Sequence, residues 1–109
     1  MNANQMIKNV RNYEKTIRQE FDKLSHIISQ INLKKYQDED ITTELKKYNK
    51  SIANYKKAMS GLNTNFKFLD AQNVMTIQEK MAIEEELDEF QNKFKEITKY
   101  VNLWGYNYV

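Results

Sequence analysis

Residues 70–83, with the sequence DAQNVMTIQEKMAI, decide the architecture of this chain. Within them, Thr76, Ile77, Gln78 and Glu79 have the pattern of a capping box. In that motif the Thr hydroxyl accepts from the amide of the third helical residue, and the Glu carboxylate accepts from the Thr amide. The pattern predicts that a helix begins at residue 76. A preceding helix would then end near residue 70, and the chain would reverse its direction between them.

Apolar residues recur at alternating spacings of three and four on both sides of this boundary. The series before it is Ile41, Leu45, Tyr48, Ile52, Tyr55, Met59, Leu62, Phe66 and Leu69, and the series after it is Ile83, Leu87, Phe90, Phe94, Ile97, Val101 and Trp104. A first series, nearer the N-terminus, is Ile7, Val10, Glu14, Ile17, Phe21, Leu24, Ile28 and Ile31, with Glu14 its one polar member. Such a stripe keeps one face of a helix against a partner helix, so the chain is expected to be all-α.

The boundary between the first two stripes is set by their phase. The stripe that ends at Ile31 is out of register with the stripe that begins at Ile41, so one helix cannot carry both. Asp40, or else Asp38, is the predicted N-cap of the second helix, because a short acidic side chain can accept from the first free amides. A helix–loop–helix connection with antiparallel neighbours follows.

These boundaries predict an antiparallel, coiled-coil-like bundle of three helices in a single domain, 1–109. The helices are expected at about 3–33, 40–70 and 76–104. The length and pattern resemble those of spectrin-repeat-like and other three-helix coiled-coil modules. One alternative stays open, because the second stripe continues in register through Asn73, Thr76 and Lys80 to Ile83. A single long helix 40–104 would then form a helical hairpin, and the chain would dimerise to cover it.

Composition narrows the class of protein further. The 109 residues include no proline, no cysteine and two glycines, so disulfides, thiolate metal sites and a many-stranded β fold are not expected. Gly105 is predicted to end the last helix, which leaves Gly61 without a role. The N-terminal residues lack the apolar region of a signal peptide, and no apolar run approaches a membrane span. We expect a cytoplasmic protein, or one exported without an N-terminal signal.

The residues that usually carry catalysis are scarce. His26 is the single histidine, and it falls at an outward position of the first stripe, where we expect it to be exposed. The acidic run Asp38-Glu39-Asp40 lacks the spacing and the glycine of a calcium loop, and it suits the N-terminal end of a helix dipole. The sequence therefore predicts no catalytic residue, no cofactor and no metal site, and we expect a protein that is not an enzyme.

Two groups of aromatic side chains are the first candidates for partner binding. Trp104, Tyr106 and Tyr108 cluster at the C-terminal end, and Tyr36 and Tyr100 lie off the stripes. Tyr and Trp are enriched among the residues that dominate binding energy in protein interfaces. This pattern favours a protein–protein interaction module of the inhibitor, adaptor or secretion-partner type. A self-assembling coiled coil is an alternative, with a second copy as the partner.

Charge is distributed unevenly along the chain. Residues 41–69 are basic, with a candidate basic face at Lys46, Lys47, Lys50, Lys56 and Lys57, whereas the last third is acidic. We expect the two to attract along the flanks of neighbouring helices. The alternative is a nucleic-acid-binding bundle that uses these lysines. That alternative is disfavoured because the chain holds fifteen Lys but only two Arg, and arginine is the better partner for phosphates and bases.

Overall fold

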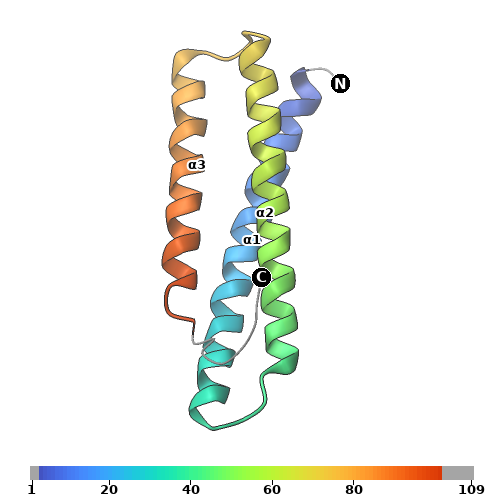
Figure 1. Cartoon of the computed structure of the whole chain (residues 1–109). Helices are drawn as coiled ribbons and strands as arrows, with labels where there is room; N and C mark the ends of the chain where they lie inside the picture. The colour runs from blue at the N-terminus through green and yellow to red at the C-terminus, as the bar shows by residue number, and fades with distance from the viewer. Residues whose placement is uncertain (1–2, 102–109) are drawn as a thin grey trace.

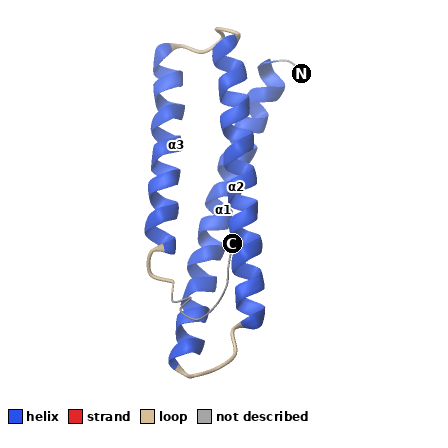
Figure 2. Cartoon of the chain, in the orientation of Figure 1, coloured by secondary structure: helices blue, strands red, loops and turns tan. Residues whose placement is uncertain are grey.

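A computed structural model describes residues 3–101, and that part of the chain forms three α-helices and no strand. They are α1, Ala3–Tyr36, α2, Thr42–Ala71, and α3, Ile77–Thr98 (Figures 1 and 2). Successive helices run antiparallel in a rod of 55 × 23 × 19 Å. The all-α three-helix bundle is confirmed, and the alternative of one long helix 40–104 is wrong.

The turn between α1 and α2 contains Asp38 in a left-handed backbone conformation, which glycine usually adopts. α1 continues three residues beyond the predicted end at 33, and Asp38 then adopts a left-handed backbone with φ of 60°. The amide of Glu39 donates to the carbonyl of Lys34 (2.8 Å), and the amide of Asp38 donates to that of Lys35 (3.2 Å). These two bonds form a Schellman cap, in which Asp38 takes the place of the usual glycine.

The start of α2 corrects the predicted cap. Neither Asp40 nor Asp38 caps the helix. The N-cap residue is Ile41, which makes no side-chain capping bond. The Asp40 carboxylate instead accepts from the hydroxyl of Thr42 at 2.8 Å. Ile41 is fully buried, so packing of its side chain fixes where the helix begins. An ion pair of 3.0 Å between Lys34 and Glu44 joins the two helices beside this loop.

The second reversal contains the predicted capping box. Asn73 turns the chain with a φ of 56°, and the helix that follows starts from Thr76. The amide of Glu79 donates to the Thr76 hydroxyl at 3.1 Å, and the Thr76 amide donates to the Glu79 carboxylate at 3.0 Å. An ion pair of 3.2 Å between Lys80 and Asp70 bridges the loop. Both boundary devices therefore work without glycine or proline.

The third helix ends earlier than predicted. It stops at Thr98 instead of residue 104, and Lys99 and Tyr100 form a turn. The Thr98 hydroxyl donates to the carbonyl of Phe94 (2.8 Å), a bond that competes with the helical pattern. The side-chain amide of Asn32 in α1 donates a hydrogen bond to the Tyr100 carbonyl at 3.1 Å, which fixes the turn. The predictions for Trp104, Gly105, Tyr106 and Tyr108 lie outside the described residues.

The core lies mainly between α1 and α2. Each of these helices fully buries eight residues, whereas in α3 (77–98, all of it described) only Phe90 is fully buried. One apolar cluster, around Phe21 and Tyr55, receives Phe90 and Phe94 from α3; the Tyr55 and Phe94 rings stack at 4.2 Å. A second cluster, nearer the first loop, is built on Leu24 and Ile52 and their neighbours. The stripes thus identify the core, and α3 covers one side of a tighter helical pair.

Gly61 acquires a role from this packing. It lies in the middle of α2 opposite the ring of Tyr13 in α1. A Cβ atom at Gly61 would lie 2.4 Å from Cζ of Tyr13, closer than real side-chain contacts allow. The missing side chain therefore lets the tyrosine ring pack directly on the backbone of α2.

Candidate functional site

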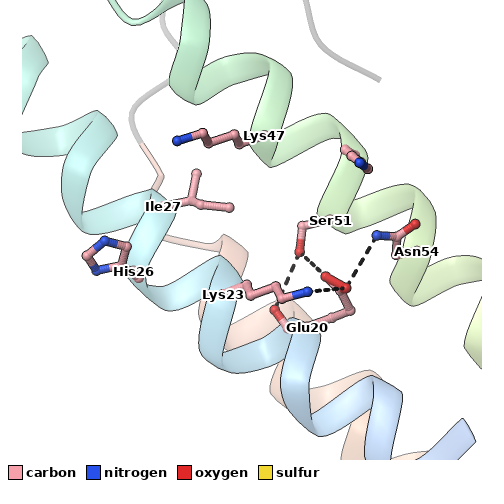
Figure 3. Close-up of a pocket in the computed structure, with 8 residues that line it drawn as sticks. Glu20, Lys23, His26, Ile27, Lys47, Ser51 and Asn54 are labelled. Carbon is pink, nitrogen blue, oxygen red and sulfur yellow. Dashed lines mark hydrogen bonds and ion pairs between the residues drawn. The ribbon is translucent and has the colours of Figure 1, made fainter.

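A recess lined almost entirely by polar and charged residues lies between α1 and α2 (Figure 3). It is a shallow hollow of about 310 Å³, and no residue of α3 lines it. We call it the lysine hollow. Its lining residues are Glu20, Lys23, His26 and Ile27 from α1, and Lys47, Lys50, Ser51 and Asn54 from α2.

The base of the lysine hollow is a buried carboxylate. Glu20 is only 4% exposed, and its carboxylate accepts from Ser51 Oγ at 2.7 Å and from Asn54 Nδ2 at 3.3 Å. Lys23 Nζ completes the set at 3.4 Å, and the three donors converge on Glu20 in Figure 3. A buried charge requires such a complete set of partners. Glu20 is therefore satisfied within the fold, and its charge is matched by Lys23.

The rim of the hollow carries the positive charges of Lys47 and Lys50, of which Lys47 interacts electrostatically with Glu44, one turn earlier in α2. Lys47 and Lys50 are exposed, and neither forms an ion pair with any residue in 3–101. Lys47 extends from α2 across the hollow, above Ile27, toward α1 (Figure 3). His26 stands at the edge on α1 and is exposed, as predicted. Two exposed ammonium groups beside the His26 ring make this recess suited to carboxylate or phosphate groups.

The structure separates the five candidate lysines. Lys47 and Lys50 share the lysine hollow, whereas Lys57 lines an adjoining recess near Tyr13. Lys46 and Lys56 are exposed and line neither recess.

The expected attraction between the lysines of α2 and the acids of α3 is wrong for the described residues. The ion pairs between helices in residues 3–101 are Arg18 with Glu86, Lys34 with Glu44 and Lys80 with Asp70, and they use none of the five lysines. The reason is geometric. α3 meets α2 through the ring of Tyr55, while the lysine hollow opens where α3 contributes no residue.

The aromatic candidates gather at one end of the bundle. Tyr36 is 90% exposed in the last turn of α1, and Tyr100 is 65% exposed just after α3. The bond from Asn32 to the Tyr100 carbonyl brings the two segments together at this end. Leu33 is also half exposed here. The other three aromatic candidates, Trp104, Tyr106 and Tyr108, follow in sequence but fall outside the part of the chain that the structure describes.

Sequence reasoning missed Glu20 and its two partners on α2. A signal was present, because Glu20 and Ser51 each directly precede a stripe residue, Phe21 and Ile52, at the same heptad phase. Residues at that phase flank the contact between paired helices. The shared heptad phase of Glu20 and Ser51 could therefore have predicted a hydrogen bond between the first and second helices.

Metal sites, membrane-spanning helices and similarity to known proteins are three further indicators of function. Within residues 3–101, no group of three or more His, Asp or Glu side chains is placed to hold a metal ion. None of the helices in this range is long and apolar enough to traverse a bilayer. No protein-family model matches the chain, and no curated protein or solved structure is significantly similar to it. The function must be argued from the geometry alone.

Proposed function

We propose that this chain is a non-enzymatic interaction module that binds an acidic segment of a partner protein in the lysine hollow. The observation that supports it is the pair of exposed lysines, Lys47 and Lys50, which line one hollow and form no ion pair within residues 3–101. Exposed charge pairs each contribute about 0.2–1 kcal/mol, so these lysines would speed and orient the encounter more than hold the complex.

Apolar contacts next to the hollow would supply the rest of the affinity. Ile27 lies within the hollow, and Leu33, which is 49% exposed, follows His26 on the same face of α1 two turns later. Seven residues of helix span about 10 Å, so one partner helix can reach both the hollow and Leu33. An acidic amphipathic helix fits this combination.

Nucleic acid fits the same surface less well. No arginine lines the lysine hollow, and Arg18 is occupied by Glu86 at 3.1 Å. No Phe, Tyr or Trp ring lines the hollow, so His26 is the one ring there on which a base could stack. Protein carboxylates, which can bind singly to each ammonium group, remain the better match.

The test uses a helical, Glu-rich peptide that carries one leucine, titrated into isotope-labelled protein. We expect amide shifts around Lys47 and Lys50, and an affinity about two- to thirtyfold lower in the double variant Lys47→Gln/Lys50→Gln. The matched control is Lys46→Gln/Lys56→Gln, which removes the same charge outside the hollow. Equal loss in both variants would overturn the proposal.

Two further arms separate the alternatives. A single-stranded oligonucleotide that bound more tightly than the peptide, with affinity falling steeply as salt rises, would favour the nucleic-acid function instead. Sedimentation over a wide range of protein concentration tests self-assembly. A mass that grew with concentration, together with no binding of the peptide, would replace the proposal by a self-assembling coiled coil.

A further inference from the structure

The outward face of α3 carries acidic charge that is not matched within the chain. Four exposed acids lie close together in the middle of this helix: Glu84, Glu85, Asp88 and Glu89. None of them forms an ion pair with any residue in 3–101. Carboxylates this close on one helix repel one another, so the face favours contact with a basic surface.

Two large apolar side chains precede these acids on the same face. Ile77 is 75% exposed and Met81 is 60% exposed. Together with Glu84 and Asp88 they follow the alternating spacing of four and three residues, so the four side chains form one outward stripe. The exposed face of α3 is therefore that of an acidic amphipathic helix, apolar at its start and acidic in its middle.

The lysine hollow continues into a second recess along the groove between α1 and α2. The hollow of about 310 Å³ and the recess of about 220 Å³ share Glu20 and Asn54 as lining residues. Lys57 lines the second recess and adds a third exposed ammonium group to those of Lys47 and Lys50. The groove is therefore basic over about 15 Å of α2, the length of ten helical residues.

The groove and the outward face of α3 also agree in the distance between their charged and apolar parts. On α3, Ile77 lies seven residues before Glu84; on α1, Leu33 lies seven residues after His26, which lines the hollow. Both separations are about 10 Å along a helix. With Glu84 over the hollow, Ile77 reaches Leu33, which is 49% exposed. This arrangement places the docked α3 antiparallel to α1.

The geometry of the bundle prevents α3 from entering the groove of its own chain. Arg18 of α1 pairs with Glu86 of α3, whereas Glu20, two residues further along α1, faces the hollow. Side chains two residues apart on a helix point about 200° apart, so α3 and the hollow lie on opposite sides of α1. The hollow of one chain can receive only the α3 of another chain, and the receiving chain keeps its own α3 free for a third. A head-to-tail contact of this kind builds a filament or a ring instead of a closed pair.

We propose that the occupant of the lysine hollow is the outward face of α3 from a second copy of this chain. This inference rests on the proposed function, because it names the acidic amphipathic helix that the hollow binds. The lysines of α2 and the acids of α3, which form no ion pair with each other within residues 3–101, pair between chains. Exposed charge pairs are weak and screened by salt, so the assembly forms at high protein concentration and low ionic strength.

Sedimentation of the full chain at low salt, over a wide range of protein concentration, tests the assembly. We expect the average mass to rise with concentration past twice that of one chain, and to fall when salt is added. Reversal of the acids in Glu84→Lys/Asp88→Lys, or of the lysines in Lys47→Glu/Lys50→Glu, should lower the association constant at least about fourfold. The chain with all four substitutions keeps the net charge of +2, and it should recover the association of the unmodified chain because the charges are complementary again.

The matched control is Asp22→Lys/Glu39→Lys, which reverses two exposed acids outside both surfaces and should weaken the assembly much less. Four results would overturn the inference: a mass that stays at one chain, a mass that stops at two chains, reversed variants that assemble as well as the unmodified chain, or a folded chain with all four substitutions that does not recover. If circular dichroism shows that Lys47→Glu/Lys50→Glu is unfolded, Lys47→Gln/Lys50→Gln takes its place. Its association should be about two- to thirtyfold weaker than that of the unmodified chain.

The Glu-rich peptide separates this inference from the proposed function. If the peptide binds at Lys47 and Lys50 while the chain stays a monomer at every concentration, the hollow keeps its proposed function and the inference about α3 is wrong. If the peptide does not bind and the mass does not grow, both are wrong. If both are right, the peptide competes with α3 for the hollow and lowers the average mass.

Discussion

Replacing Gly61 by alanine tests the close contact between α1 and α2. In the interior of an exposed helix, alanine is favoured over glycine by up to about 1 kcal/mol. Sequence alone would therefore predict a more stable protein. In this structure the new methyl group would lie 2.4 Å from Cζ, 2.6 Å from Cε1 and 2.9 Å from Cε2 of Tyr13. Favourable contacts between carbon atoms begin at about 3.5 Å, so the ring must move by about 1 Å.

The expected change in the free energy of unfolding follows from the packing contacts that the displaced Tyr13 ring would lose. Tyr13 is half-buried and packs against the apolar cluster that holds Phe21 and Leu62. Overpacking of this kind costs about 1–3 kcal/mol. Subtracting the gain in helix propensity, we expect Gly61→Ala to lower the free energy of unfolding by about 1 kcal/mol.

A double-mutant cycle in urea, followed by circular dichroism, isolates this contact. In the Tyr13→Ala background the ring is absent, so Gly61→Ala should raise the free energy of unfolding by about 0.5–1 kcal/mol. The coupling between the two sites is then about 2 kcal/mol. Ser60→Ala, at the exposed neighbouring position, serves as the control and should not couple to Tyr13. The packing argument is wrong if Gly61→Ala stabilises the protein equally in both backgrounds.

Two other substitutions test the buried carboxylate and the second boundary. Ser51→Ala removes the 2.7 Å bond to Glu20 and leaves a buried charge short of one donor, so the free energy of unfolding should fall by about 1–3 kcal/mol. An unchanged urea midpoint would contradict this expectation. Ala53→Ser, at an exposed position of the same helix, is the control. At the capping box, the bonds from Thr76 lower the pKa of Glu79. Their stabilisation is therefore present above pH 4.5 and is lost as the pH falls. Thr76→Ala should raise the exchange of the first amides of α3 at pH 6 because it removes the hydroxyl that accepts from the Glu79 amide. Glu79→Gln should remove the acid dependence, because the titrating acceptor of the residue 76 amide is gone. Profiles equal to that of the unmodified protein would refute the cap.

Most of the fold follows from the spacing of apolar residues, and the helix ends do not. The stripes identify the buried residues because each helix hides one face, and the capping box marks a reversal with local chemistry. The ends of the helices depend on tertiary contacts. Buried Ile41 starts α2 without a side-chain cap, and Asn32, distant in sequence, holds the turn after Thr98. Neither contact has a local signature.

The lysine hollow shows a different limit. The stripe positions predict that Lys47 and Lys50 are exposed, which the structure confirms. Their meeting with Lys23 and His26 depends on how far α2 is shifted along α1. A shift by one heptad, about 10 Å, leaves apolar residues facing each other and is not excluded by periodicity. The register is instead selected by contacts between individual pairs of residues, which the spacing of apolar residues does not encode.

Those pair contacts also explain why α2 is held firmly on α1 and α3 is held less firmly. Tyr13 against Gly61, Glu20 with Ser51 and Lys34 with Glu44 fix α2 on α1 at three separate levels of the rod. α3 runs parallel to α1, and its contacts Arg18–Glu86 and Asn32–Tyr100 share one offset of 68 residues.

Both of those α1–α3 contacts are exposed, whereas the bond from Ser51 to Glu20 is buried. An exposed contact favours one register of the helices by only a small free energy. A buried polar contact favours it strongly, because a shift of register would leave buried polar groups without partners. The side-chain contacts that set the position of α3 on α1 are therefore the weaker of the two sets, and α3 is the helix whose position a mutation should change most easily.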